Sequence, residues 1–282
     1  MRSAQRDVSV AEAERLLAAV AGQKAAGREI ADLRFGPVTQ SVHGARWKPV
    51  DARQLSFRNV EWTHGSILGR LLGRARVQEC RFERVNLDDF DAKKVDFADC
   101  RFEGVTFGEQ FLGVIKDCTF TGCSFVNCRF DAVGFVESTL RSCRFEGIKG
   151  ERTRWTNCLI DDVVMSGKLV KVNFIDNSLR KVDLSAVEMF DCGFLGGKQE
   201  ELRLPDEPRN FAVDPRVMLA AEEQLREKLG TEALANYRHF AEGASQFGPR
   251  FLVNAGVLTV LSPQDREVVI ATLYEMRHSA SS

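Results

Sequence analysis

The sequence lacks any segment that could span a membrane. No apolar run approaches the roughly eighteen residues that a transmembrane helix requires. The segment from Met1 to Asp7 leads into a charged amphipathic stretch, which differs from the apolar core of a signal peptide. We therefore expect a cytoplasmic protein with no membrane partner. The remaining composition, 44% hydrophobic and 28% charged residues, is ordinary for a globular chain.

The sequence also lacks the motifs of the common catalytic sites. It has no phosphate-binding loop, no dinucleotide-binding glycine pattern and no nucleophile elbow. Gly196-Gly197-Lys198 is not a phosphate loop, because the upstream Gly and the downstream Ser or Thr are missing. The four histidines lie in separate regions, at no spacing typical of metal ligands: His43, His64, His239 and His278. We expect no enzyme activity and no cofactor.

Cys-x-x-Cys pairs are absent, although the chain has eight cysteines. Each cysteine instead lies two positions before a regularly spaced position that is usually a large apolar residue: Cys80, Cys100, Cys118, Cys123, Cys128, Cys143, Cys158 and Cys192. A tight interior corner accepts a small, weakly polar side chain, and free Cys behaves as a small hydrophobe. We therefore expect buried free thiols, which suit a reducing compartment, and no metal site.

What the sequence does contain is a repeat of five residues. A first run of large apolar residues at every fifth position extends from Phe57 to Leu112 without a slip. A second run follows after a shift of three residues, and a third begins at Leu169, one residue short of phase, and ends at Phe194. Together the runs hold 28 units. Helices repeat at 3.6 residues and strands at 2, so a fixed period of five indicates a solenoid.

Individual units show the same order of residue types. Cys80-Arg81-Phe82-Glu83-Arg84 and Val182-Asp183-Leu184-Ser185-Ala186 each read small, polar, then Phe or Leu, then two variable residues. In this order the units resemble those of the pentapeptide-repeat family, over about half of the chain. The resemblance implies a mainly β fold, a right-handed quadrilateral β-helix with four units in each coil. On this basis 28 units make about seven coils.

The large apolar residues at the centre of each unit are predicted to fill the inside of the coil. The aromatic members of this predicted core are Phe82, Phe97, Phe102, Phe107, Phe120, Phe125, Phe130, Phe135, Phe145, Trp155, Phe174 and Phe194. Gly150 removes one central side chain, and Ala92 reduces another. Three extra residues separate Leu112 from Phe120, and we expect residues 113–117 to bulge outward. Such a bulge is either a contact site or a tolerated surface insertion.

Three regions follow from these patterns. Residues 1–50 form an N-terminal region, with a capping helix over about 10–25 that begins at a capping box and an irregular lead-in over 31–50. Residues 51–197 form the β-helix. Residues 198–282 form a linker and a C-terminal helical unit, whose helices are predicted to begin at Asp214-Pro215, Thr231 and Ser262-Pro263. This unit could cap the rod, dimerise or bind a partner.

Charge along the repeats is banded. A basic stretch is followed by an acidic one, and residues 45–197 carry about 23 basic and 22 acidic side chains. We expect Arg81 and Arg101 to stack one coil apart and to be neutralised by Glu83 and Glu103. The residues at the boundary of the two bands are our candidates for a partner-binding surface: Arg70, Arg74, Arg76, Arg81, Arg84, Asp88, Asp89, Asp91, Asp96, Asp99 and Lys116.

A rigid rod with banded charge favours complementarity to one protein partner. We expect a non-enzymatic bacterial binding protein, an inhibitor, immunity or scaffold protein that masks a functional surface of a toxin, an enzyme or a topoisomerase. Family members that confer quinolone resistance imply one alternative, protection of gyrase by partial DNA mimicry, but near-neutral repeats argue against an overall mimic. A purely structural spacer is another alternative. We expect no direct nucleic-acid contact, and dimerisation through the C-terminal helices or a β-helix end stays open.

Overall fold

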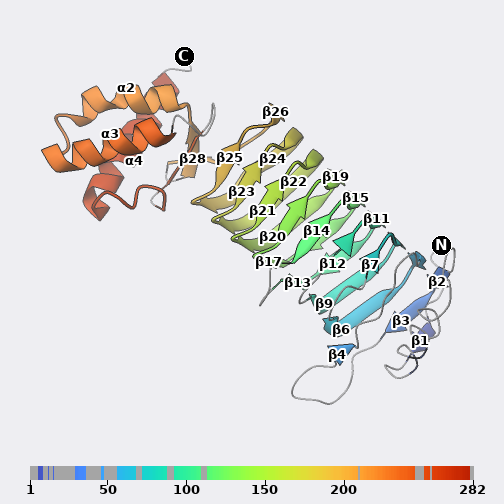
Figure 1. Ribbon diagram of the computed structural model, residues 1–282. Coiled ribbons are helices and arrows are strands. Elements are labelled where there is room, and N and C mark those ends of the chain that lie inside the picture. Colours follow the sequence, from blue (N-terminus) through green and yellow to red (C-terminus); the bar gives the residue numbers. More distant parts are fainter. Residues whose placement is uncertain are drawn as a thin grey trace.

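A computed structural model shows a rod of short stacked strands with helices at one end (Figure 1). The structure describes residues 6–8, 12, 15, 29–35, 46–47, 56–67, 72–87, 92–108, 113–208, 210–244, 251–254 and 256–279. Of the helices described in these ranges, none is long and apolar enough to cross a membrane.

The five-residue unit folds as a short strand followed by a corner. In the unit of strand β11 (Asp96–Ala98), Phe97 points inward, its two neighbours point outward, and Asp99 turns the corner with φ 53°. Left-handed backbone is unfavourable for most L-residues, so each corner costs free energy. The coil offsets this cost through hydrogen bonds, since the Asp99 amide donates to the Thr121 carbonyl at 2.9 Å in the next coil.

Four such units close one coil, and we name its four sides faces A to D in chain order. Face D is a parallel sheet of seven strands: β7 (Leu72–Gly73), β10 (Ala92–Lys93), β14 (Val114–Lys116), β18 (Gly134–Val136), β21 (Arg154–Thr156), β23 (Asn173–Ile175) and β25 (Gly193–Leu195). From β7 to β25 the coil makes about six turns, which confirms the predicted solenoid.

Faces A, B and C share one larger sheet, because several strands continue around a corner. Face A begins with β2 (Glu29–Ala31), β5 (Ser56–Arg58), β8 (Arg76–Gln78), β11, β15 (Thr119–Thr121) and β19 (Thr139–Arg141), and it ends with β26 (Lys198–Glu200). Face B holds β1 (Arg6–Val8), β3 (Leu33–Phe35), β12 (Arg101–Glu103) and β16 (Ser124–Val126). Face C holds β4 (Arg46–Trp47), β13 (Thr106–Phe107) and β17 (Arg129–Asp131).

The longest strands supply two or three faces each. They are β6 (Glu61–Ile67), β9 (Arg81–Leu87), β20 (Arg144–Glu151), β22 (Leu159–Val170) and β24 (Ser178–Phe190). β6, β9 and β20 run from face B to face C, whereas β22 and β24 extend from face A through face B to face C.

The core is a set of aromatic columns, as predicted. All twelve predicted aromatic core residues are buried. Along face B the rings of Phe82, Phe102, Phe125 and Phe145 stack in one column, with centroids 4.8, 4.8 and 4.4 Å apart. Offset-stacked rings add stabilisation beyond the area they bury. The column therefore fixes the register of successive coils as well as filling the interior.

The predicted bulge over residues 113–117 is wrong. Val114–Lys116 forms strand β14, in which Ile115 is fully buried and pairs with Ala92 and Phe135 of the adjacent coils. The apolar residue of this unit is thus Ile115, and the three extra residues precede it. The phase was misassigned because Leu112 also stands five positions after Phe107. Residues 109–112, which hold most of the insertion, lie outside the described residues.

The one-residue shortening before Leu169 is absorbed at Gly167. Its backbone has φ 124°, and a Cβ atom there would lie 2.1 Å from the Ile148 carbonyl oxygen. Pairing between β20 and β22 shifts register after Phe145, resumes with Ile148 opposite Gly167, and places Gly150 opposite Leu169. Gly150 occupies a central position, as predicted, and the Leu169 side chain lies where its Cβ would be. Leu169 therefore fills the space that Gly150 leaves.

The lead-in that we predicted as irregular over 31–50 contains paired strands. β2 pairs with β5, β3 with β6 and β4 with β6, so parts of residues 29–47 belong to the coil. Phe35 stands opposite Trp62, and Val8 of β1 stands opposite Phe35. Of the predicted N-terminal helix, only Glu12 and Arg15 are described, and both are helical. The other residues of 10–25 lie outside the described residues.

A three-stranded sheet joins the rod to the helices. β27 (Asp206–Glu207), β28 (Asn210–Val213) and β29 (Phe251–Asn254) pair antiparallel. One side of this sheet faces the last coil, where Leu252 packs into the core of the rod. On the same side, the side-chain amide of Asn254 donates a hydrogen bond to the backbone carbonyl of Met189. The other side carries Phe211 and Val253 into the helical core. The C-terminal unit thus caps the rod through a sheet, which the sequence did not predict.

The helices begin close to the predicted residues. α2 (Pro215–Leu225) is capped by Asp214, whose side chain accepts a hydrogen bond from the Arg216 amide. α3 (Thr231–Ala244) and α4 (Pro263–Ser279) begin at the predicted positions, and the Ser262 hydroxyl accepts a hydrogen bond from the amide three residues on. These N-caps satisfy amides that have no partner within a helix.

Candidate protein-binding face

The thiols inside the rod are structural. All eight cysteines are buried, and Cys100 donates to the Val77 and Ala98 carbonyls at 3.3 Å. Burial raises the pKa of Cys118 and of Cys128 to about 12, so both remain neutral thiols at physiological pH. Within the described ranges, no group of three or more His, Cys, Asp or Glu side chains could hold a metal ion. The outer faces of the rod carry the remaining candidates for function.

The predicted charge ladder is present on face B. The Arg81 guanidinium lies 2.9 Å from the Glu83 carboxylate and 3.2 Å from that of Glu103. Arg101 pairs with Glu103 at 3.1 Å, and these cations lower the pKa of Glu103, with Arg101 the main cause. Each of these four charges thus has a partner of opposite sign. Surface pairs of this kind contribute little free energy, but they leave almost no net charge for a partner.

The candidate residues at the charge boundary do not share a face. Arg70, Asp88, Asp89 and Asp91 lie outside the described residues. Of the other seven, Arg76 and Asp96 lie on face A, Arg81 on face B and Lys116 on face D, and three occupy different corners: Arg74, Arg84 and Asp99. Bands in the sequence become rings around the rod, because four consecutive units point in four directions.

Toward its C-terminal end, face D carries more apolar side chains at its outward positions than the other faces do. Its outward positions there hold Val136, Thr156, Ile175 and Leu195, all partly exposed, together with the glycines 134 and 193. Val114, one coil earlier, is 37% exposed. A flat run of partly exposed apolar side chains on a rigid sheet is typical of the centre of a protein interface.

Basic side chains line the edge between faces C and D, and we call Arg152, Arg154 and Lys171 the basic rim. Arg152 lies 3.5 Å from Glu151, with both side chains exposed. Arg154 and Lys171 make no ion pair with any residue that the structure describes. On the far side of face C, away from this edge, Lys149 stands in register with Arg129 and with Lys168, whose amine lies 4.6 Å above the Phe190 ring.

A groove of about 560 Å³ runs along this edge. It is lined by the basic rim and by the backbone of Gly113 and Gly134, with Asn173 at one end. The groove exists because glycine at position 134 places no side chain between Val114 and Arg154 in the outward column of face D. The opposite corner of face D carries Asp117 and Glu137, which pairs with Lys116 at 3.1 Å.

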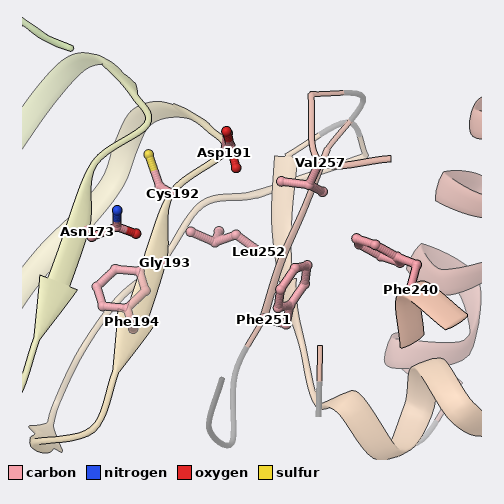
Figure 2. Close-up of a pocket in the computed structure, with 9 residues that line it drawn as sticks. All are labelled: Asn173, Asp191, Cys192, Gly193, Phe194, Phe240, Phe251, Leu252 and Val257. Atoms are coloured by element: carbon pink, nitrogen blue, oxygen red, sulfur yellow. The ribbon is translucent and has the colours of Figure 1, made fainter. Parts of the chain in front are cut away.

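A second, smaller cavity lies where the rod meets its cap (Figure 2). Its volume is about 230 Å³, and Asn173, Asp191, Cys192, Gly193 and Phe194 line it from the rod side. Phe240, Phe251, Leu252 and Val257 line it from the C-terminal unit. Figure 2 shows Phe251 between the rod residues and Phe240. The Phe240 and Phe251 rings contact each other edge to face, with their centroids 5.5 Å apart. We call this cavity the junction pocket.

Sequence reasoning missed the basic rim, although the repeat contains its signal. Arg152 and Lys171 both fall at corner positions, one coil apart, and Arg154 follows at an outward position. The spacing from Arg152 to Lys171 is 19 residues because one residue is missing before Leu169. If every coil held 20 residues, Arg152 and Lys171 would fall at different positions of the five-residue unit. The junction pocket has no comparable signal, since it depends on how the cap docks.

No protein-family model and no curated protein matches the chain. Among solved structures, it is similar to full-length QnrB1, a plasmid-mediated fluoroquinolone resistance protein, at 13% identity and a TM-score of 0.32, over 62% of this chain and 99% of that one. It is also similar to HetL, a pentapeptide repeat protein of the cyanobacterium Nostoc involved in the regulation of heterocyst differentiation, at 11% identity and a TM-score of 0.18, over 70% of this chain and 95% of that one.

The class of the protein rests on its own repeat. Five-residue units, four to a coil, with parallel strands in register from coil to coil, define a pentapeptide-repeat β-solenoid. The chain is therefore a pentapeptide-repeat rod, closed at one end by a sheet and three helices.

Proposed function

We propose that the protein is a non-enzymatic binding protein and that face D contacts a protein partner. One observation carries the proposal: partly exposed apolar side chains on a rigid sheet are bordered by cations without ion-pair partners among the described residues. An apolar centre with a charged border matches the composition of protein interfaces. A preorganised sheet also loses little conformational entropy on binding.

A protein partner fits this face better than nucleic acid. Double-stranded DNA is bound mainly through many phosphate contacts, so its binding sites are basic over a long track. Here the apolar centre is uncharged and the opposite corner is acidic. A binding role is also favoured over catalysis because the buried cysteines already donate hydrogen bonds to backbone carbonyls, and burial raises the pKa of thiols such as Cys118.

Affinity capture from the native cytosol tests the proposal. Ile175→Glu places a charge at the centre of face D, and Val126→Glu places the same charge at the equivalent outward position of face B. Glu103 already occupies that position in another unit, so the strand accommodates glutamate there. Because Val126 lies in register between Glu103 and Glu146, the control is the more demanding variant, and urea melts establish that both variants fold. We expect a partner that the wild-type protein and Val126→Glu capture and that Ile175→Glu loses. Equal capture by both variants would refute a role for face D.

An inhibitor, an immunity protein and a scaffold would all use such a face. The three are separated by what the captured partner does: an inhibited enzyme or a neutralised toxin loses activity in the complex, whereas a scaffolded protein keeps it. Proteins encoded beside the gene are the first candidates, because an immunity protein and its toxin are commonly adjacent.

Partial DNA mimicry requires an acidic surface, and several of the acids that the structure describes are paired with bases. Asp161 pairs with Arg180, Asp131 with Arg129 and Glu103 with Arg101. A supercoiling assay measures this alternative directly. If micromolar protein changes gyrase activity or its inhibition by a quinolone, gyrase is a partner, and the Ile175→Glu variant then shows whether face D makes the contact.

A further inference from the structure

We propose that the groove and the junction pocket form one site for an acidic peptide segment that carries a single large apolar side chain. The proposal rests on the proposed function, because it names the chemistry of the partner that face D would contact. It commits to a protein segment with carboxylates along the basic rim and an apolar anchor in the junction pocket.

The two hollows meet on face D at Asn173, which lines both of them. The Asn173 side chain makes no hydrogen bond within the described residues. The outward column between them runs Gly134, Arg154, Asn173 and Gly193 in consecutive coils. At about 4.8 Å for each coil these four residues span roughly 15 Å, which is the length of four or five residues of extended peptide. A short segment can therefore reach both hollows at once.

The groove is suited to carboxylates. Arg152, Arg154 and Lys171 converge on it, and only Arg152 has an ion pair among the described residues, a 3.5 Å contact with the exposed Glu151. Arginine binds carboxylates through two parallel hydrogen bonds, and charge-assisted bonds are stronger than neutral ones. Gly134 leaves room for a peptide to approach the backbone of the sheet. Cationic side chains around an open groove favour an anionic occupant.

The junction pocket is suited to an apolar side chain. Phe194, Phe240, Phe251, Leu252 and Val257 supply most of its wall. Its volume of about 230 Å³ suits one large aliphatic or aromatic side chain.

Asp191 is the one acidic side chain that lines either hollow, and it belongs to the pocket. An acidic group on the partner is therefore repelled from the pocket and attracted to the groove, which fixes the direction of the bound segment.

A nucleic acid does not fit this arrangement as well. Phosphates could pair with the basic rim, but the junction pocket offers two aromatic rings that already contact each other edge to face, at 5.5 Å and 83°. A stacked base needs an open aromatic face. The site also has three cations and one acid, whereas nucleic-acid grooves are basic along their whole length.

The test uses the full-length protein and a fluorescent synthetic peptide of about ten Asp and Glu residues with one Trp at its centre, so that the direction of binding is not prescribed. A second peptide replaces Trp by Ala, and a single-stranded oligonucleotide of equal charge serves as the nucleic-acid probe. The protein variants are Arg154→Glu with Lys171→Glu, and the matched control Arg74→Glu with Lys94→Glu. Glu79 and Glu137 already occupy corners with positive φ, so the corners at Arg74, Lys94 and Lys171 tolerate Glu. Arg154 lies at an exposed outward position of strand β21.

We expect the Trp peptide to bind wild type and the control with affinities within about twofold. Loss of the rim charges should weaken binding at least tenfold, and so should replacement of Trp by Ala. No binding to wild type, equal binding to both double variants, or tighter binding of the oligonucleotide would overturn the proposal. These outcomes would not affect the affinity-capture result with Ile175→Glu, which tests whether face D binds a protein at all. The peptide site can therefore be refuted while the proposed function stands.

Discussion

Replacing Phe125 by Ala tests the packing of the rod most severely. Phe125 is 1% exposed, and its ring stacks on Phe102 at 4.8 Å and on Phe145 at 4.4 Å. Truncation of a buried Phe to Ala costs about 3–5 kcal/mol, through lost transfer free energy and the cavity that remains. Each aromatic pair adds roughly 0.5–1.5 kcal/mol beyond area burial. Because two stacked pairs are lost, we expect a value near 5 kcal/mol.

Urea denaturation of the purified variant measures this change in the free energy of unfolding. Val126→Ala is the matched control, since Val126 is the next residue of the same strand and points outward. We expect the control to change stability by less than about 0.5 kcal/mol. Thermal unfolding should show a loss of roughly 10 °C or more for Phe125→Ala, at about 2–4 °C for each kcal/mol in a chain of this size. A loss below about 1 kcal/mol would refute the inward stacking of Phe125.

Three further predictions concern the backbone, the cap and the thiols. Gly167→Ala should lower the free energy of unfolding by at least about 1–3 kcal/mol, because Gly167 adopts φ 124° and has no space for a Cβ. Gly243→Ala in α3, where nothing lies within 4 Å of the added Cβ, should raise it by up to about 1 kcal/mol. Urea melts that give the two variants the same stability would contradict this. Asn254→Ala should lower the free energy of unfolding by about 1–3 kcal/mol, because the Met189 carbonyl of the last coil loses its donor. In limited proteolysis the cap of this variant should be cleaved faster than that of the wild type, and earlier than the rod. Folding raises the pKa of Cys118 and Cys128 to about 12, above the unfolded value near 8.5. The free energy of unfolding should therefore be insensitive to these thiols below about pH 8 and should fall as the pH rises from there toward 12. A variant with Val at both positions should show a shallower fall, because only Cys158, Cys192 and the other buried thiols then contribute to it, and an unchanged slope would refute the assignment.

The repeat itself could be predicted because its period is independent of distant contacts. Each unit carries its own inward residue, small residue and corner, so Phe82 or Phe145 can be placed without knowledge of the rest of the chain. Insertions between units are harder to place from the sequence. Leu112 and Ile115 both offered an apolar centre, and only pairing with the adjacent coils selects Ile115.

Features that depend on docking between units could not be predicted. The alternation in β28 and β29, with Leu252 toward the rod and Val253 toward the helices, appears in the sequence only as a short apolar run. The seven described candidates at the charge boundary lie on different faces and corners for a geometric reason. Neighbours in sequence such as Arg81 and Arg84 point in different directions, whereas Arg152 and Lys171 are brought together by one turn of the coil.

The most direct test of the account places one glutamate on each face in turn and measures the affinity for the captured partner by surface plasmon resonance. The four variants are Thr121→Glu on face A, Val126→Glu on face B, Val170→Glu on face C and Val136→Glu on face D, all at the same outward place in the unit. We predict that Val136→Glu alone weakens binding at least tenfold, even though Val126→Glu and Val170→Glu stand in register with existing glutamates and should cost more stability. Full affinity for Val136→Glu together with a loss on another face would contradict the account.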